Sequence, residues 1–221
     1  MADEARAVDE ARAGELILVR HGQTEWSVAG RHTGVTDIPL TAEGEEQARR
    51  VGGFLRKRPR PSLVLVSPRR RARRTAALAG LTDAPPDLPA GLVADTRIVD
   101  ELVEWDYGGY EGRTTAEISA DLGKPWTIWA DGAVPGATPG ETLEQVARRA
   151  GAAIDQARPT LAAGGDVVMV AHGHLLRVLA AVWLELEPSA GAHLILSAGS
   201  VNVLGAEHAV PALALWNHVP D

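Results

Sequence analysis

The stretch Glu15–Trp26 reads ELILVRHGQTEW, and it decides the fold because its apolar run ends abruptly in Arg20, His21 and Gly22. A short, continuous apolar run is typical of a strand that is buried on both faces. The stretch therefore predicts a central strand with a guanidinium and an imidazole at its carboxyl end. Gly22, which has no side chain, is expected to let backbone N–H groups approach an anion closely.

Further buried strands are predicted by the apolar runs at Ser62–Ser67 and Asp166–Gly173. Helices are expected at 39–57, with Thr41 as N-cap, and at Arg69–Ala79, 140–165 and 174–186. Strands that are apolar throughout and alternate with helices indicate an α/β fold. We expect three layers, α/β/α, around a mostly parallel central sheet.

Three regions fall outside this alternation. Residues 80–95 are rich in Pro, Asp and Gly and are expected to form a loop. Residues 106–140 are expected to form an excursion over one end of the sheet. The tail from 192 to 216 carries short strand-like runs, among them 193–197.

Composition limits the class of protein. The chain has 221 residues, 45% of them apolar, which suits one domain at 14–221 after a flexible extension at 1–13. Cysteine is absent, which excludes a disulfide framework, a thiolate nucleophile and cysteine-ligated zinc. A net charge of -7 argues against a nucleic-acid partner, so an anionic substrate needs a local cationic focus. With no membrane-length apolar run and no signal peptide, we expect no membrane partner and a cytoplasmic location.

The polar residues that could carry chemistry follow the predicted strands. Ligands of open α/β sheets bind outside the carboxyl ends of the strands. Three clusters fall at that edge, and they are Arg20-His21-Gly22, Ser67-Pro68-Arg69 and His172-Gly173-His174. We expect them to converge on one crevice.

His21 has two interpretations. A neutral imidazole is a nucleophile, and Arg20 beside it favours the neutral form. Alternatively, His21 is a strand-end residue that only hydrogen-bonds to backbone. The His-Gly-His spacing at 172–174 also suggests a metal site, but no carboxylate stands nearby in sequence to complete it; we expect no metal and no cofactor.

Helical periodicity separates the arginines that follow the second strand. Five arginines fall within residues 69–74, and Arg71 lies on the edge of the apolar stripe that contains Ala72 and Thr75. Arg71 is therefore expected to point inward, and the other four, Arg69, Arg70, Arg73 and Arg74, are expected at the surface. Arg20, Arg71 and two imidazoles around one crevice suggest a phosphate ligand.

A phosphoryl-transfer site also needs a proton donor for the leaving group. Four carboxyl groups of the segment 100–112 are the candidates, and they are Glu101, Glu104, Asp106 and Glu111. Glu104 precedes Trp105, which could desolvate it in part. The residues alone do not choose among the four, and each could be a surface acid.

The motifs resemble those of the histidine phosphatase superfamily, the phosphoglycerate-mutase-like family, over nearly the whole chain after residue 14. The matching segments occur in the family's order, and they are LVRHGQTEWS, the segment Gly30–Ala48, VSPRRRARRTA, EWDYGGYEG, PGET at Pro139–Thr142 and VAHGH. Their combination is most similar to the branch of sugar-phosphate phosphatases, such as sedoheptulose-bisphosphatase-like enzymes, and broad-specificity acid phosphatases. The resemblance implies a phosphoglycerate-mutase-like fold and often a homodimer.

The resemblance also implies roles for individual residues. His21 attacks phosphorus and becomes a phosphohistidine, Glu104 protonates the leaving group, and His172 takes part in catalysis at the phosphate. Phosphate binding falls to Arg20, Arg71, Ser27 and Gly173, where Ser27 stands at a position at which many members have asparagine. Substrate binding is implied for Gln23, Thr24, Thr33 and Gly34. His174 could reach the substrate or begin the next helix, and we favour the helix.

These features favour a metal-independent phosphomonoester hydrolase acting on small phosphorylated metabolites. Phosphoglycerate mutase is the alternative, but the insertion between Glu104 and His172 is short and poor in cations that could hold a carboxylate. A non-catalytic module that binds a phosphorylated ligand is a second alternative. It is disfavoured because the histidine and the acid are both present.

Overall fold

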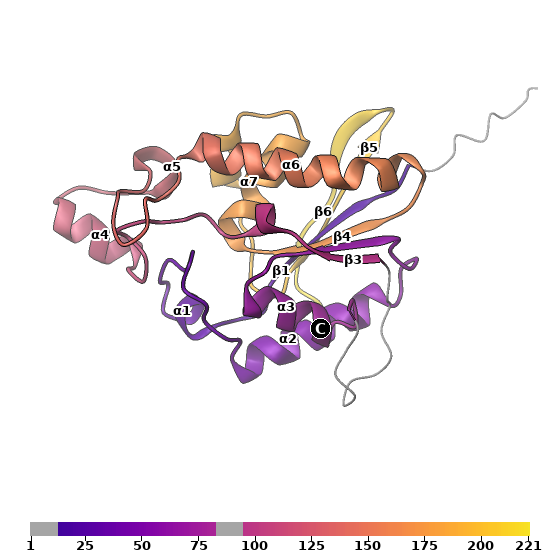
Figure 1. Cartoon of the computed structure of the whole chain (residues 1–221), viewed down its shortest axis with the longest axis horizontal. Coiled ribbons are helices and arrows are strands. Elements are labelled where there is room, and N and C mark those ends of the chain that lie inside the picture. Colours follow the sequence, from indigo (N-terminus) through magenta and orange to yellow (C-terminus); the bar gives the residue numbers. More distant parts are fainter. Residues whose placement is uncertain (1–12, 83–94) are drawn as a thin grey trace, which may run out of the picture.

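The computed structural model describes residues 13–82 and 95–221. One six-stranded sheet, in the order β3-β2-β4-β1-β5-β6, lies at its centre (Figure 1). The strands are β1 Leu16–Arg20, β2 Leu63–Val66, β3 Asp95–Ile98, β4 Val167–Ala171, β5 Val201–Glu207 and β6 Val210–His218. Strands β3, β2, β4 and β1 run parallel, whereas β5 and β6 pair antiparallel. The predicted mostly parallel α/β fold is therefore confirmed.

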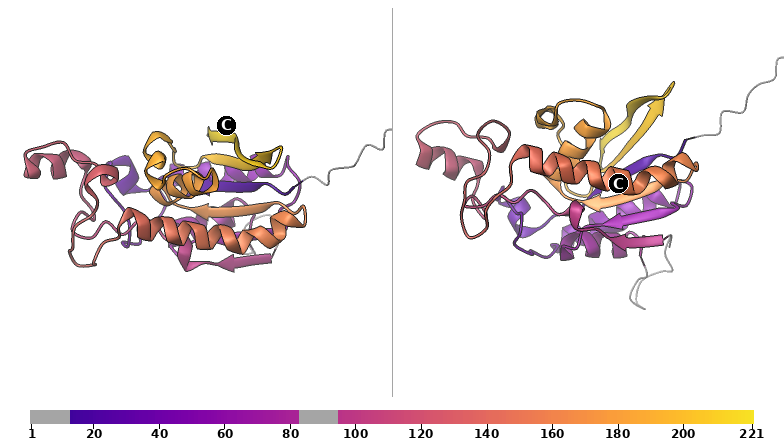
Figure 2. Two further views of the ribbon diagram at one scale, coloured as in Figure 1. Left: turned by 90° about the horizontal axis from the view of Figure 1, so that it is seen from above. Right: turned by 45° about the horizontal axis from the view of Figure 1, so that its top comes forward.

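Helices cover both faces of the sheet, as Figures 1 and 2 show. The longer helices are α2 Ala42–Leu55, α3 Arg70–Leu78, α6 Leu143–Ala162 and α7 Gly173–Trp183. Alternate residues of β1 serve the two layers: Ile17 and Val19 belong to the core under α2 and α3, and Leu16 and Leu18 to the core under α6 and α7. This strand is apolar throughout because both of its faces are buried.

The predicted N-cap of α2 is confirmed, since the Thr41 hydroxyl accepts the Gly44 N–H at 3.0 Å. The remaining short helices are α1 Glu25–Val28, α4 Thr115–Leu122 and α5 Ile128–Asp131, with 3-10 turns η1 Asp100–Leu102 and η2 Pro188–His193. Helices α4 and α5 belong to the predicted excursion and project past the carboxyl end of the sheet (Figure 1).

Two predictions about irregular regions were incomplete or wrong. Most of the expected loop at 80–95, like residues 1–12 of the expected extension, lies outside the described residues, but strand β3 begins at Asp95. The expected strand at 193–197 does not form. Its carbonyl oxygens bind side chains instead, because Ile195 accepts from the Trp216 indole and Leu196 from the Arg20 guanidinium.

The expected role of Gly22 was also wrong. Its N–H donates to the Thr75 hydroxyl at 3.1 Å, so it does not face a ligand. A Cβ at Gly22 would lie 2.1 Å from the Gly44 carbonyl oxygen, and a Cβ at Gly44 would lie 2.1 Å from the Gln23 carbonyl oxygen. Both glycines are needed because α2 approaches the end of β1 closely, and this contact fixes the segment that carries His21.

Candidate active site

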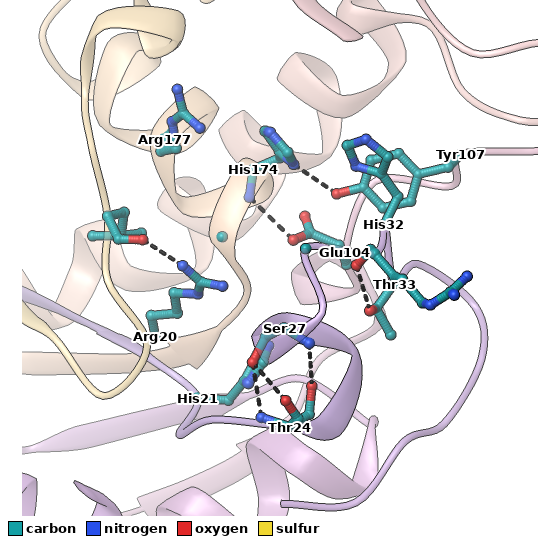
Figure 3. Close-up of a pocket in the computed structure, with 14 residues that line it drawn as sticks. Arg20, His21, Thr24, Ser27, His32, Thr33, Glu104, Tyr107, His174 and Arg177 are labelled. Atoms are coloured by element: carbon teal, nitrogen blue, oxygen red, sulfur yellow. Dashed lines mark hydrogen bonds between the residues drawn. The ribbon is translucent and has the colours of Figure 1, made fainter. Parts of the chain in front are cut away.

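The carboxyl ends of β1, β2 and β4 bring the three predicted polar clusters together. The His21 N–H donates to the Ala171 carbonyl at 3.0 Å, and the Ser67 N–H donates to Val170 at 3.0 Å. The His21 and His172 rings lie 5.1 Å apart, centre to centre. A cavity of about 190 Å³ opens beside them, and Figure 3 shows the side chains that line it.

His21 lies in this cavity with one ring nitrogen free. Its Nδ1 is 2.7 Å from the Gly22 carbonyl oxygen, which can only accept, so Nδ1 carries the proton and Nε2 keeps its lone pair. Burial first, and then Arg71 and Arg20, lower the pKa of His21 well below its usual value. The structure thus holds a neutral imidazole with a free Nε2, as a nucleophile requires.

Arg20 is a guanidinium prepared for an anion. Its Nη1 donates to the Leu196 carbonyl, but its buried Nε has no hydrogen-bond partner among the residues that the structure describes. The guanidinium packs against Gly173, where a Cβ would lie 3.4 Å from Cζ and from Nε. A buried donor without a partner is costly, and a phosphoryl oxygen would supply the missing acceptor.

Arg71 points inward and is fully buried, as its helical phase predicts. Of the other four arginines, Arg70 and Arg73 are exposed, whereas Arg69 and Arg74 are half-buried. Arg71 does not line the cavity, because its donors already hold a neighbouring loop. Its Nη1 donates to Thr36 at 2.9 Å, and its Nη2 donates to the carbonyls of Thr33 and Gly34, both at 3.1 Å.

His172 lies behind His21 instead of facing the cavity. Its Nδ1 accepts the Arg71 Nε–H at 3.1 Å, so a neutral His172 carries its proton on Nε2, which donates to Ser67 Oγ at 2.7 Å. Burial first, and then Arg71 and His21, lower the pKa of His172 well below its usual value. In this arrangement both ring nitrogens of His172 have protein partners, and its role at the phosphate stays a prediction.

Glu104 is the one carboxylate among the described residues that line the cavity. Its Oε1 accepts the N–H groups of Trp105 at 2.9 Å and Leu175 at 2.8 Å, and its Oε2 accepts that of His174 at 3.0 Å. Two of these donors belong to the first turn of α7, where the helix dipole favours an acidic group. Three backbone N–H donors therefore replace the water that burial removes from the carboxylate, and Trp105 supplies one of them.

None of the other three candidate acids lines the cavity. Glu111 accepts the N–H of Gly34 at 2.9 Å and that of Thr36 at 3.0 Å. Asp106 Oδ1 accepts the Thr138 hydroxyl at 2.6 Å, and Glu101 contributes its carbonyl to Arg149 at 2.7 Å.

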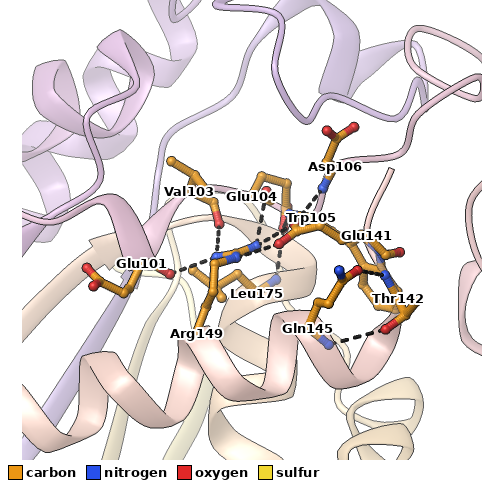
Figure 4. A network of polar contacts seen from close by, with 10 residues as sticks. All are labelled: Glu101, Val103, Glu104, Trp105, Asp106, Glu141, Thr142, Gln145, Arg149 and Leu175. Atoms are coloured by element: carbon orange, nitrogen blue, oxygen red, sulfur yellow. Dashed lines mark hydrogen bonds and ion pairs between the residues drawn. The ribbon is translucent and has the colours of Figure 1, made fainter. Parts of the chain in front are cut away.

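A polar network supports the segment that carries Glu104 (Figure 4). Arg149, from α6, donates to the carbonyls of Glu101 at 2.7 Å and Val103 at 2.9 Å. Glu141, from the PGET motif, pairs with Arg149, and its Oε2 also accepts the Asp106 N–H at 3.0 Å. The pair therefore holds the backbone on both sides of Glu104.

The expected substrate-binding residues divide into two groups. Thr24 and Thr33 line the cavity, whereas Gln23 and Gly34 do not. Gln23 Oε1 accepts the Thr41 hydroxyl at 3.0 Å, which ties it to α2.

Ser27 and Gly173, both expected at the phosphate, line the cavity. The Ser27 hydroxyl accepts the Thr24 N–H at 2.9 Å, which is one half of a capping box at α1, and it donates to the Thr24 carbonyl at 2.9 Å. Its proton is therefore directed at backbone and away from the cavity. Gly173 is the first residue of α7 and lies against the Arg20 guanidinium.

Several cavity residues were not expected from the sequence, and they are Gly30, Arg31, His32, Tyr107, Arg177 and Leu196. The prediction for His174 was incomplete, because it belongs to α7 and also lines the cavity. Its Nδ1 lies 2.6 Å from the Tyr107 hydroxyl. Arg177 follows His174 by one helical turn, and this spacing is the signal that could have placed it at the cavity.

Within residues 13–82 and 95–221, no group of three or more His, Cys, Asp or Glu side chains could hold a metal ion. Over the same residues, no helix is long and apolar enough to cross a membrane.

A sequence model described as "Histidine phosphatase superfamily (branch 1)" matches residues 16–219. The chain belongs to this superfamily. An acid phosphatase of Mycobacterium tuberculosis is 37% identical over 205 residues, 92% of each chain. The sedoheptulose 1,7-bisphosphatase of Saccharomyces cerevisiae is 38% identical over 193 residues, 77% of this chain and 67% of that one.

The solved structure of the M. tuberculosis Rv3214 product matches with a TM-score of 0.82 and 36% identity, covering 94% of this chain and 99% of that chain. The predicted family and fold are thereby confirmed, and a histidine phosphatase-type phosphomonoesterase is the class that these relatives support. Proteins named phosphoglycerate mutase are relatives as well, and the one from Methylobacterium sp. is 34% identical over 211 residues, 93% of this chain and 88% of that one.

Proposed function

We propose that the protein is a metal-independent phosphomonoesterase that hydrolyses small phosphorylated metabolites through a phosphohistidine formed on His21. The observation that carries the proposal is the pairing of two groups in one cavity. His21 has a free Nε2, and Arg20 has a buried Nε without a partner. A phosphoryl group would occupy both, since it offers an electrophile to the first and an anionic oxygen to the second.

In the first step, Nε2 of His21 attacks phosphorus, and the bond between phosphorus and the ester oxygen breaks. The electron pair of that bond goes to the leaving oxygen, which takes a proton from Glu104. The products are a phosphohistidine, a free alcohol and an ionised Glu104. The three N–H donors around Glu104 stabilise the charge it acquires.

In the second step, water attacks the phosphorus of the phosphohistidine and the bond to Nε2 breaks. Glu104, now ionised, takes a proton from the water, and this restores its starting state. The neutral state of His21 is restored with inorganic phosphate as the product. Arg20 compensates the charge of the equatorial oxygens in both steps.

Arg71 and His172 act from behind the phosphoryl group. Arg71 already donates to four acceptors, three of which are carbonyls of one loop, so its main contributions are its charge and the position of Thr33–Thr36. His172 ties Arg71 to Ser67 at the end of β2. We propose that both are needed because they fix the electrostatic field at His21.

The decisive test is trapping of the intermediate. A labelled phosphomonoester should transfer its phosphoryl group to the wild-type protein, and the acid-labile, base-stable label should map to His21. His21→Ala should remove both the label and turnover while the thermal melting curve stays unchanged. A variant that still turns over would point to another nucleophile, and binding without any transfer would favour the non-catalytic module.

Mutase activity is the second candidate, because mutases are among the relatives. Supplying 3-phosphoglycerate with and without a bisphosphate primer distinguishes the two. Release of inorganic phosphate supports the phosphatase, whereas primer-dependent conversion to 2-phosphoglycerate supports the mutase. Undiminished turnover in EDTA is expected for a reaction that needs no metal.

We further propose that residues 14–221 act as one domain, that the protein is cytoplasmic, and that it forms a homodimer. Limited proteolysis, cell fractionation and light scattering test these points in turn.

A further inference from the structure

The segment 194–200 holds Arg20 at two points, although it forms neither a helix nor a strand. Its Leu196 carbonyl accepts from Nη1 of the Arg20 side chain (Figure 3), and its Ser200 carbonyl accepts the Arg20 N–H at 3.1 Å. The Leu196 carbonyl is thus the acceptor that directs the guanidinium. Because no sheet ladder fixes this segment, the direction of that carbonyl depends on what else binds the chain around it.

The carboxyl end of β6 binds the segment on both sides of Leu196. The Trp216 indole N–H donates to the Ile195 carbonyl at 2.6 Å, and the Asn217 Oδ1 accepts the Ser197 N–H at 2.6 Å. The Leu196 side chain is buried, which anchors the segment in the core, whereas the Ile195 side chain is 74% exposed. The contacts from β6 therefore add what side-chain packing leaves open, the rotation of the peptide planes.

The peptide unit between Leu196 and Ser197 lies between Asn217 and Arg20. The Leu196 C=O and the Ser197 N–H belong to this one unit, which is planar and trans, so they point in opposite directions. Asn217 binds the N–H edge of the plane, and Arg20 binds the C=O edge. A rotation of the plane would break both hydrogen bonds together. Asn217 thereby fixes the acceptor that orients Arg20.

Asn217 reaches this peptide because β6 carries a bulge. The register between β5 and β6 shifts at Val201–Val203, where Trp216 and Asn217 lie opposite Asn202 alone. A bulge re-aims the side chains of its strand, and Asn217 has a φ of 54°, in the left-handed region that asparagine adopts more readily than most residues.

A second asparagine ties the bulge to the strand that carries Arg20. The Asn217 N–H donates to Oδ1 of the buried Asn202 at 2.6 Å. The Asn202 Nδ2 donates in turn to the Leu18 carbonyl of β1 at 3.1 Å, two residues before Arg20. The bulge is therefore fixed relative to β1, and it can hold the segment 194–200 at a set distance from the end of that strand.

We propose that Asn217 is a positioning residue, which acts through the Leu196–Ser197 peptide to direct the Arg20 guanidinium at the phosphoryl group. The inference rests on the proposed function for the role of Arg20 as the phosphate ligand. Asn217 does not line the cavity, so it contributes by preorganisation. A guanidinium whose direction is already fixed loses less freedom when it binds an anion.

Two substitutions separate the acceptor of Asn217 from its backbone conformation. Glycine keeps the left-handed φ without strain but removes Oδ1, whereas aspartate keeps an oxygen acceptor and tolerates the same conformation. We expect Asn217→Gly to raise the Kd for inorganic phosphate by ~10-fold or more and to lower kcat/KM for p-nitrophenyl phosphate by a similar factor. Asn217→Asp should stay within about 3-fold of the wild-type protein in both measurements.

The NMR signal of the Arg20 Nε–H, in protein with isotope-labelled arginine, reports the guanidinium directly. The signal is assigned by its loss in Arg20→Lys. It should shift or broaden in Asn217→Gly and stay sharp in Asn217→Asp. Ala209→Gly is the matched control, because Ala209 has a φ of 65° at the exposed turn of the same hairpin. It should change neither the phosphate Kd nor the signal.

The outcomes distinguish this inference from the proposed function. A phosphate Kd in Asn217→Gly within about 2-fold of wild type would overturn the positioning role, as would an equal loss of affinity in Asn217→Asp or in Ala209→Gly. A wild-type protein that binds phosphate but forms no phosphohistidine would overturn the proposed function and leave the positioning role in place. No phosphate binding by the wild-type protein would overturn both.

Discussion

Arg149 and Glu141 form a bidentate ion pair, with Nε to Oε1 and Nη2 to Oε2 both at 2.7 Å. Each side chain is 19% exposed, so the pair is largely shielded from solvent. The remaining donors of Arg149 reach carbonyls on the segment before Glu104, and Glu141 accepts the Asp106 N–H after it. The catalytic acid proposed here is thus positioned by a residue pair that lies outside the cavity lining.

This relationship predicts a leaving-group effect in Glu141→Gln. Losing one charge of the pair should let the Glu104 segment shift and lower kcat more than it raises KM. Alkyl phosphates, whose leaving oxygen needs a proton, should lose ~10-fold or more in kcat, about 1.4 kcal/mol. p-Nitrophenyl phosphate should lose much less, because nitrophenolate leaves without protonation.

Asp155→Asn is the control for this prediction, since Asp155 is an exposed partner of Arg158 on the same helix. Asp155→Asn should leave kcat unchanged for both kinds of substrate. An equal loss for both kinds of substrate in Glu141→Gln would indicate a general structural defect and not a displaced acid.

Arg71→Ala should lower kcat/KM by at least ~100-fold, a few kcal/mol of lost charge stabilisation. The substitution removes a buried charge, frees the Thr33–Thr36 carbonyls and leaves His172 without its donor. Arg70→Ala, at an exposed neighbour, should change kcat/KM by less than ~3-fold. Steady-state kinetics on protein shown to be folded by circular dichroism makes the comparison, and a larger loss in Arg70→Ala would contradict the assignment.

The most successful predictions from the sequence concern features that depend on local hydrophobic periodicity or on the positions at which strands end. Continuous apolar runs located β1, β2 and β4, and the carboxyl ends of these strands had to meet at one edge. The helical phase of the segment Arg69–Ala79 was enough to predict that Arg71 is buried. Whether the donors of Arg71 face a ligand or the carbonyls of Thr33–Thr36 depends on a loop conformation that neither period nor strand position determines.

The misses share a physical cause. Strand β3 reads DTRI and lies at the sheet edge, largely exposed, so it has no apolar signature. The apolar run 193–197 resembles a strand, but distant side chains bind its carbonyls. Arg177 acquires its setting from Gly191, Ala192 and Trp129, all remote in sequence, so its neighbours along the chain give no indication of its partners.

Stability should fall as the pH is lowered from about 7 towards 5. Burial lowers the pKa values of His21, His172 and His174 well below their usual range, so these groups stay neutral in the folded state. The unfolded chain binds protons at these positions near pH 6.5, whereas the folded chain does not until its lower pKa values are reached. The unfolded state is therefore increasingly favoured as the pH falls below about 6.5. The loss of stability ends once the pH is below the pKa values of the folded state.

Denaturant titrations at pH 7.5, 6 and 5 measure this effect as the free energy of unfolding. His172→Asn should flatten the dependence, because it removes one buried group that the unfolded state protonates. His208→Asn, at an exposed turn, is the control and should leave the slope as it is. A free energy of unfolding that rises on acidification would have the wrong sign for buried neutral histidines.

Activity should change with pH in the opposite direction to stability over part of this range, and rise as the pH is lowered. The lowered pKa of His21 keeps the nucleophile neutral in mild acid, and the proposed first step needs a proton on Glu104. We therefore expect kcat/KM for an alkyl phosphate to be higher at pH 5.5 than at pH 8.5, in short assays that precede any unfolding. Glu104→Gln should abolish this dependence along with most of the turnover. A rate that climbs steadily to pH 9 in the wild-type protein would mean that Glu104 is not the proton donor, and a loss centred on pH 6.5 would mean that His21 titrates as an exposed imidazole does.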